Sequence, residues 1–216
     1  MPEELTAEQA VGLITPGDRV FVGSACATPL TLLAALDARR PVVPGVRLVH
    51  FLAGGTGKRY PQEVFFVGSE LRGRTAPGVV DYVPLSSGDL PALIQGGQIR
   101  VDVALIQVAP PDEHGNCSLG VSVDVTLAAA LAARVVLAEV NPDMPRTGPS
   151  SMLPADRITA FVPVPGPVAE YVHEPVGEAA ARIAPYVARL VPDGATLQIG
   201  LGRVPNEMLR HLTGRR

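Results

Sequence analysis

Short runs of mostly apolar residues, separated by helix-forming segments, limit the folds open to this 216-residue chain. Two such runs, 101–108 and 135–140, do not alternate between apolar and polar residues. Strands of this kind are buried on both faces, as in parallel sheets covered by helices. The Ala-rich segment Val123–Ala133 lies between them and predicts a connecting helix. This βαβ order indicates an open, mostly parallel α/β sheet with flanking helices.

The same pattern predicts the other elements. A Thr6-Ala-Glu-Gln9 capping box predicts a helix that ends near Ile14, and a helix with proline in its first turn is expected at Pro29–Ala38. Another helix is expected from Gly177 to Val191, where Pro185 should kink or divide it. The strands are expected at 19–23, 46–52, 63–67, 79–85, 101–108, 135–140 and 158–164.

Composition narrows the class of protein. Hydrophobic residues make up 47% of the chain and charged residues 18%, which is enough for a substantial core. Only 4% of residues are aromatic, there is no Trp and the net charge is −3, so nucleic acid is not an expected partner. The acidic start has no apolar signal core, and no apolar run approaches the roughly 20 residues that span a bilayer. We therefore expect a cytoplasmic protein that does not bind membranes.

An internal similarity suggests a second, related domain. The segment Leu13–Leu36 resembles Leu190–Leu212: Gly17 aligns with Gly194 and, with one residue of slack, Pro29 aligns with Pro205. Each copy reads as a helix, a Gly turn, a strand, a Gly-rich loop and a helix opened by proline. Generic βα units also resemble one another, and that alternative remains open. We expect a first domain at 1–176 and the start of a second at 177–216.

The Gly-rich loop of the second copy is a candidate ligand site. Gly200-Leu-Gly202-Arg-Val-Pro-Asn206 joins the expected strand to the expected helix. Glycines let a ligand approach the backbone closely, and free N–H groups at a helix start favour phosphate or an oxyanion. A plain structural turn is the alternative. The loop is not a dinucleotide fingerprint, because Pro205 occupies the third glycine position.

Two other motifs have simpler interpretations than a catalytic site. Gly54–Lys58 fails the P-loop spacing, so nucleotide hydrolysis is not expected. Asp112, Glu113 and His114 follow a strand and could act as acids or bases, although Pro110–Ser118 is better explained as a rigid turn.

Cysteine and histidine do not indicate a metal site. The chain has two cysteines, Cys26 and Cys117, without zinc-type spacing, and we expect Cys117 to be a buried apolar residue rather than a nucleophile. The other three histidines, His50, His173 and His211, are isolated in the sequence, so no metal is expected.

Four segments carry a family resemblance. They are similar to stretches of acetyl-CoA hydrolases/transferases and of 4-hydroxybutyrate or butyrate CoA-transferases. The resemblance implies the NagB/RpiA/CoA-transferase-like fold, in two related α/β domains over a chain roughly twice this length. The segments are GDRVFVGSACATP (Gly17–Pro29), LIQVAPPDEHGNCSLGVSVD (Leu105–Asp124), VLAEVNPDMPRT (Val136–Thr147) and DGATLQIGLGRVPNEML (Asp193–Leu209).

The resemblance also implies a chemistry. A glutamate of the second domain, located a short distance after Asn206, would attack an acyl-CoA thioester and form first an anhydride and then a glutamyl-CoA thioester. The sequence ends at Arg216, before that segment, so no catalytic residue is assigned. By motif match, the family's CoA-binding loop corresponds to Gly202, Arg203, Val204, Pro205 and Asn206.

The sequence departs from the family pattern near its start. Ala27-Thr28 stands where the family often shows Gly-Glu, and the segment after His50 is shorter than usual. Both departures leave the acyl substrate open.

The expected function is transfer of CoA between a short-chain acyl-CoA (acetyl-, butyryl- or 4-hydroxybutyryl-CoA) and a carboxylate. Coenzyme A is then a substrate, and no tightly bound cofactor or metal is expected. Two alternatives remain: an acyl-CoA hydrolase of the same family, and a non-catalytic small-molecule-binding module. We further expect a homo-oligomer, or association with a carboxy-terminal half.

Overall fold

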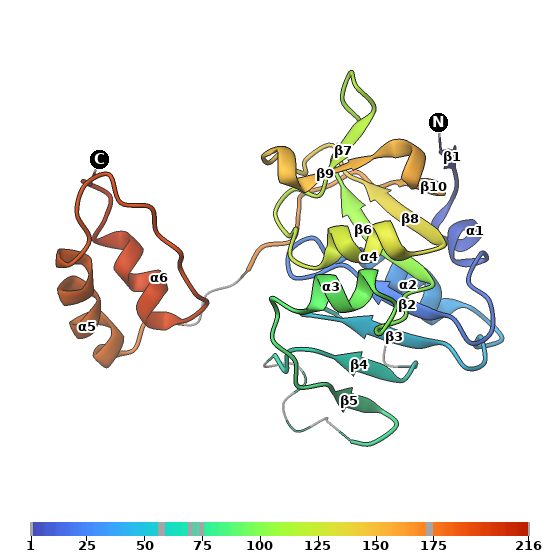
Figure 1. Ribbon diagram of the computed structural model, residues 1–216, viewed down its shortest axis with the longest axis horizontal. Coiled ribbons are helices and arrows are strands. Elements are labelled where there is room, and N and C mark those ends of the chain that lie inside the picture. The colour runs from blue at the N-terminus through green and yellow to red at the C-terminus, as the bar shows by residue number, and fades with distance from the viewer. Residues whose placement is uncertain are drawn as a thin grey trace. The chain divides into compact units, whose positions relative to one another are not determined.

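The computed structural model describes residues 2–55, 59–68, 71, 73, 76–171 and 175–215. By their contacts these residues divide into two compact units, Met1–Glu170 and Tyr171–Arg216. Unit 1 holds the sheets and four helices, and unit 2 holds two helices (Figure 1).

Unit 1 is built on an eight-stranded sheet in which every described strand pair is parallel. Its strand order is β1-β10-β8-β6-β2-β3-β4-β5, with β6 and β2 at the centre. The predicted open, mostly parallel α/β sheet is confirmed. The strands are β1 (Glu3–Glu4), β2 (Arg19–Val22), β3 (Arg47–His50), β4 (Gln62–Val64), β5 (Val80–Tyr82), β6 (Val103–Val108), β8 (Val135–Val140) and β10 (Ala160–Pro163).

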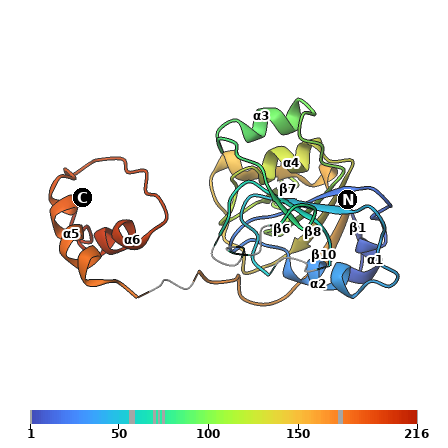
Figure 2. The ribbon, with the colours of Figure 1, turned by 90° about the horizontal axis from the view of Figure 1, so that it is seen from below.

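Helices cover both faces of this sheet, as Figure 2 shows. One buried cluster joins α1 and α2 to side chains such as Val20, Leu105 and Leu137. The other joins α3 and α4 to the opposite face, through Phe21 and Ile106. The helices are α1 (Ala7–Val11), α2 (Leu30–Ala38), α3 (Leu90–Gln95) and α4 (Thr126–Ala132). Burial on both faces explains why the central strands are almost wholly apolar.

Local sequence signals set several boundaries as predicted. Thr6 and Gln9 form the predicted capping box at the start of α1, with each side chain accepting the other's backbone N–H. The strand predicted at 135–140 is present with those bounds as β8. The strands predicted at 46–52, 63–67 and 79–85 are present as shorter segments.

The structure adds elements that we did not predict. They are α3, β1 and a two-stranded antiparallel sheet formed by β7 (Asn116–Ser118) and β9 (Met152–Pro154). Two short 3-10 turns, Pro149–Ser151 and Ala155–Arg157, flank β9.

Ion pairs link the strands near the amino edge of the sheet. Asp18, which is almost fully buried, accepts hydrogen bonds from the Thr15 backbone and hydroxyl and from Arg134. Burial raises the pKa of Asp18, but the hydrogen bonds from Thr15 and Arg134 outweigh it and hold that pKa below its usual value. Arg47 contacts both Glu63 and Asp81.

Unit 2 consists of α5 (Glu178–Arg189) and α6 (Arg203–Arg210), which pack through Ala184, Ala188 and Met208. Pro185 is expected to kink or divide this helix; division is wrong, because α5 runs through Pro185 without a break, and the kink stays a prediction. Pro185 removes one backbone hydrogen-bond donor from α5. The packing of Ala184 and Ala188 against Met208 of α6 stabilises the helix despite this loss. The strand expected from the internal similarity is absent among the described residues 175–215.

Candidate functional site

The carboxyl edge of the sheet gathers the loops that carry most of the sequence motifs. Because the strands are parallel, the loops after β2, β3, β6 and β8 leave from the same edge. Ligands of open α/β sheets bind at this edge, beyond the strand ends. These loops are therefore the candidate site of unit 1.

The loops after β2 and β3 are joined to each other. The Ala25 N–H donates to the Leu52 carbonyl, and Ala25 and Ala53 form a short parallel β-bridge between the two loops. The Thr28 hydroxyl donates to the Ala25 carbonyl over 2.7 Å and accepts the Gly54 N–H over 3.0 Å. Ala25 has a φ of +49°, a left-handed conformation that costs a residue with a Cβ atom energy. Strain of this kind clusters at functional sites.

The side chain of His50, the last residue of β3, supports the loop that follows this strand. Its side chain is buried; Nδ1 accepts the Ala53 N–H over 3.3 Å and Nε2 lies 3.1 Å from Gln62 Oε1. The amide oxygen can only accept, so the proton belongs on Nε2. Burial lowers the pKa of His50, although the Gln62 hydrogen bond partly opposes this. His50 is a neutral imidazole that supports a loop.

Glu139 places a buried carboxylate near the end of β8. Its Oε1 accepts the Leu32 N–H over 2.7 Å, and its Oε2 accepts from Gln107 Nε2 over 3.1 Å. Burial raises the pKa of Glu139, and the hydrogen bonds from Leu32 and Gln107 act in the opposite direction. We did not single out this residue. The available signal was a lone acid in the apolar run 135–140.

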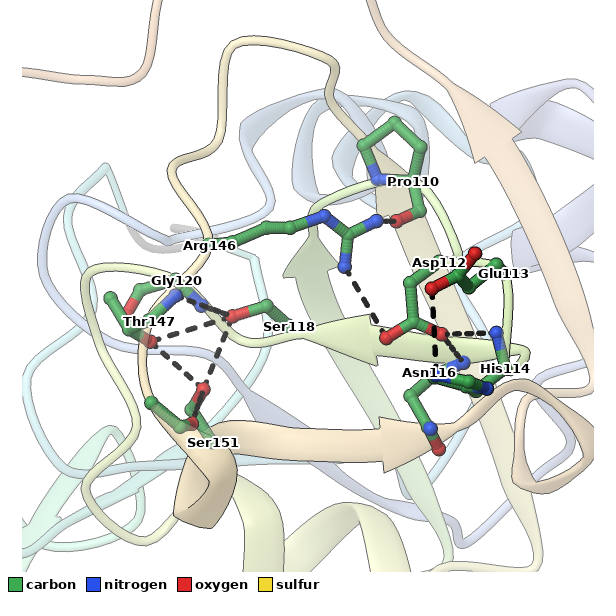
Figure 3. A network of polar contacts seen from close by, with 11 residues as sticks. Pro110, Asp112, Glu113, His114, Asn116, Ser118, Gly120, Arg146, Thr147 and Ser151 are labelled. Atoms are coloured by element: carbon green, nitrogen blue, oxygen red, sulfur yellow. Dashed lines mark hydrogen bonds and ion pairs between the residues drawn. The ribbon is translucent and has the colours of Figure 1, made fainter.

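Asp112 organises the turn after β6, shown in Figure 3. Its Oδ1 accepts the His114 and Asn116 N–H groups over 3.0 and 2.8 Å, which is the geometry of an Asx turn. The Asn116 N–H, above all, lowers the pKa of Asp112. The side chains of Glu113 and His114 are exposed and face each other at 3.6 Å. The segment thus contains a turn stabilised by Asp112, as the turn interpretation expects, and continues as the strand β7.

Three hydroxyl groups connect the turn after β8 to the two-stranded sheet of β7 and β9 (Figure 3). Ser118 Oγ accepts the N–H groups of Gly120 and Thr147 over 3.2 and 3.1 Å, and lies 3.1 Å from Ser151 Oγ. The Thr147 hydroxyl donates to the Gly120 carbonyl over 2.9 Å. These hydroxyls serve one another and the backbone, so they support the loop and do not form a nucleophile–base pair.

Arg146 brings positive charge to the same edge. Its guanidinium donates to the Pro110 carbonyl and lies 3.9 Å from Asp112 Oδ2 (Figure 3). The side chain remains about two-fifths exposed, with a relative exposure of 41%. A partly exposed guanidinium beside a backbone turn can bind a carboxylate or phosphate.

Cys117 is fully buried, and burial raises its pKa to about 11. A thiol of this kind stays protonated and is a poor nucleophile. The expectation of a buried apolar cysteine is confirmed.

The predicted loop of unit 2 lies at the start of α6. Gly202 precedes the helix with φ +154° and no side-chain cap, and Arg203, Val204 and Pro205 form the first turn. Gly202 and Arg203 are exposed, and the Asn206 N–H donates back to the Gly202 carbonyl over 3.1 Å. The five residues are thus contiguous around one helix N-terminus, and their role in binding CoA stays a prediction.

Two further observations concern the described residues. No group of three or more His, Cys, Asp or Glu side chains there could hold a metal ion. None of the helices described is both long and apolar enough to cross a bilayer. Residues Thr56–Lys58 of the Gly-rich segment, and His173, lie outside the described ranges.

The chain matches known sequences and structures. The family model for the acetyl-CoA hydrolase/transferase N-terminal domain matches residues 3–152. Among curated proteins, the chain is 36% identical over 98% of its length to a 4-hydroxybutyrate coenzyme A transferase from Clostridium kluyveri. It spans 51% of that relative, and so about half the length of the curated relatives that it matches.

Solved structures agree with this. A 4-hydroxybutyrate CoA-transferase from Porphyromonas gingivalis is similar with a TM-score of 0.80 and 33% identity, over 99% of this chain and 52% of that one. RipA from Yersinia pestis is similar with a TM-score of 0.87 and 30% identity, over 99% and 54%. The predicted fold and the predicted resemblance are both confirmed.

Proposed function

Because this chain belongs to the acetyl-CoA hydrolase/transferase family, we propose that its complete gene product transfers CoA between a short-chain acyl-CoA and a carboxylate. One observation carries this proposal: the family match covers 3–152, and so includes every loop of the carboxyl-edge site up to the Ser118–Ser151 hydroxyl cluster. The curated relatives over this region are CoA transferases by name. We also propose that this protein acts in the cytoplasm.

The proposed chemistry uses a glutamate nucleophile beyond Arg216. Its carboxylate would attack the thioester carbonyl, expel CoA thiolate and form an acyl-glutamyl anhydride. The thiolate would then attack the glutamyl carbonyl, which releases the first carboxylate and leaves a glutamyl-CoA thioester. The acceptor carboxylate reverses these steps. Asp112 and the hydroxyl cluster are engaged in structural contacts, so we assign them no step of this reaction.

We propose that 177–216 begins a second domain related to 1–176, and that Gly202–Asn206 of that domain binds CoA. Gly17 and Gly194 support the relation, because both have a left-handed backbone, with φ of +81° and +77°. The exposed start of α6, which has no side-chain cap, supports the binding role, since the positive end of a helix dipole favours phosphate or a developing oxyanion.

Exposed apolar side chains on unit 2 support the proposal that this protein associates with another chain. Its helices leave Ile183, Tyr186 and Leu190 exposed. Apolar side chains of this size favour association, either with a carboxy-terminal half or with a second copy. Light scattering on the purified chain tests this, and a monomer at high concentration would contradict it.

An acyl-CoA hydrolase is the alternative within the family. The two activities differ in whether water or a carboxylate resolves the covalent intermediate. Acetyl-CoA consumption with and without added short-chain carboxylates separates them. We expect turnover to depend on the carboxylate; full-rate consumption without an acceptor would overturn the transferase proposal.

A non-catalytic binding module is the alternative from another class, since fold alone does not fix function. The coding sequence downstream of Arg216 distinguishes it. An in-frame continuation, or an adjacent gene with a glutamate-bearing partner, supports the enzyme. The absence of both would support the module.

A further inference from the structure

Three polar side chains form a row across neighbouring strands at the carboxyl edge. Gln107 and Glu139 are paired residues of β6 and β8. Ser24 and Gln107 each lie two residues past the paired Val22 and Leu105. Residues two apart on a strand share a face, so Gln107 and Glu139 continue the apolar face of Leu105 and Leu137 that packs on α2, and the buried Ser24 follows the end of β2 beside them in this polar row (Ser24, Gln107 and Glu139). An apolar face therefore ends in a polar row at the candidate site.

The row supplies a helix cap from a distant part of the chain. Leu32 is the third residue of α2, so its N–H has no partner within the helix. Pro29 occupies the cap position and has no side-chain acceptor, and Glu139 Oε1 accepts the Leu32 N–H instead. A carboxylate at this position also interacts favourably with the helix dipole. Gln107 holds the second oxygen and so orients the carboxylate.

The start of α2 is also the end of the strained loop. Thr28 immediately precedes Pro29, and its hydroxyl connects Ala25 to Gly54. A left-handed alanine persists only where its surroundings hold it. An anchor on the first turn of α2 therefore fixes one end of that loop, while the strand β2 fixes the other.

Packing alone does not explain the row. Ser24 Oγ and Gln107 Oε1 are buried without a hydrogen-bond partner among the described residues. Buried polar groups left unpaired cost stability, and an apolar row would fill the same space without that cost. Stability alone therefore does not account for the polar side chains at these positions.

We propose that Glu139 is a positioning residue: by anchoring the first turn of α2, it holds the Ser24–Thr28 loop in the geometry that acyl transfer requires. This inference rests on the proposed function, because it assigns Glu139 to the same carboxyl-edge site.

Kinetics on the complete gene product test it. Glu139→Ala should lower kcat about 100-fold with a smaller change in KM for the acyl-CoA, because misplacing site groups by about 1 Å costs that much. Glu139→Gln keeps an acceptor for the Leu32 N–H and should stay within about 5-fold of the natural protein. If Glu139→Ala does not fold, Glu139→Asp, whose carboxylate is one methylene further from α2, should show the same change at smaller size.

Asp18→Ala is the matched control. It removes the other buried, hydrogen-bonded carboxylate, from the amino edge of the same sheet. It should lower Tm as much as Glu139→Ala does and leave kcat of the folded protein unchanged. Equal losses of kcat in both variants, or no recovery in Glu139→Gln, would overturn the positioning role.

Amide hydrogen exchange separates this inference from the proposed function. Peptides covering 24–32 should exchange at least about 10-fold faster in Glu139→Ala than in the natural protein or in Asp18→Ala. If the natural protein transfers no CoA, the proposed function fails, and this exchange pattern still decides whether Glu139 anchors the loop. Unchanged exchange over 24–32 in Glu139→Ala would overturn the inference.

Discussion

The two similar segments, Leu13–Leu36 and Leu190–Leu212, reach the same local shapes in different surroundings. In the first, Asp18 N–H donates to the Thr15 carbonyl over 3.2 Å; in the second, Ala195 N–H donates to the Pro192 carbonyl over 3.4 Å. Each turn is followed at a distance by a helix, α2 or α6. Turns and helices satisfy their backbone groups locally, so both copies form them.

The strand behaves differently. In the first copy, β2 pairs with β3 on one side and β6 on the other. In the second copy, the described residues 195–200 form no strand. A strand needs neighbours for its N–H and C=O groups, and the helices of unit 2 offer none. The comparison teaches which parts of a βα unit are encoded locally and which depend on the sheet.

The helix starts differ as well. The start of α2 is capped by the buried carboxylate of Glu139, whereas the start of α6 follows the exposed Gly202 without a side-chain cap. In the first copy, a carboxyl group from a distant strand accepts the helix N–H. In the second copy no side chain does so, and CoA binding at that position stays a prediction.

The largest expected difference between the copies is in packing. Leu33 of α2 is buried at 3% exposure, and its counterpart Leu209 of α6 is 44% exposed. Leu33→Ala should lower the free energy of unfolding by about 2–5 kcal/mol, and Leu209→Ala by less than about 1 kcal/mol. Denaturant unfolding followed by circular dichroism measures both. Equal costs would show that unit 2 packs as tightly as unit 1.

The open start of α6 gives the next largest effect. Gly202→Val adds a branched side chain at a φ of +154°, where a ligand would approach the backbone. Loss of one or two polar contacts should weaken CoA binding by about 1–3 kcal/mol, or roughly ten- to a hundredfold. Calorimetry on the complete gene product measures this. Unchanged affinity together with a lower Tm would assign the loop a structural role only.

The turns at Gly17 and Gly194 should lose similar amounts of stability when each glycine is replaced by alanine. A Cβ atom at Gly17 or Gly194 would meet no other atom within 4 Å, so only the left-handed backbone opposes it. Gly17→Ala and Gly194→Ala should each cost about 1–2 kcal/mol of local stability. Urea unfolding and amide exchange near each turn measure the costs. A clear inequality between the two would argue against a common origin for the turns.

The smallest expected effect is the pH dependence of stability, and it concerns two carboxyl groups: Asp18 within the first copy and Glu139, which caps its helix. Burial raises the pKa of Glu139, so its contribution to stability is present at low pH and is lost as pH rises through the raised value. The lowered pKa of Asp18 has the opposite sign: its contribution is present above the ordinary aspartate pKa and is lost as pH falls.

Melting temperatures over a pH series check both signs. The natural protein should lose Tm relative to Glu139→Gln as pH rises, and relative to Asp18→Asn as pH falls. If both differences move in the same direction, one of the two assignments is wrong.

The sequence predicted what periodicity and local chemistry control. Apolar runs such as 135–140 located the central strands, and the Thr6 capping box located α1. The short β7 and β9 could not be predicted, because three residues carry no readable period. The role of Glu139 could not be predicted either, since its partner Leu32 is 107 residues away. A long-range contact of this kind depends on the sheet order.

The position of β1 has a consequence for synthesis. It pairs with β10, so the first-made strand of the sheet is completed by the last-made one. At about 5–20 residues per second, the roughly 160 residues between them take on the order of 10 s to emerge from a ribosome. During that interval the growing chain carries unpaired strand edges, and closing so long a loop is slow. We therefore expect the sheet to be completed only after β10 has been synthesised, and the nascent chain to be more prone to aggregation until then.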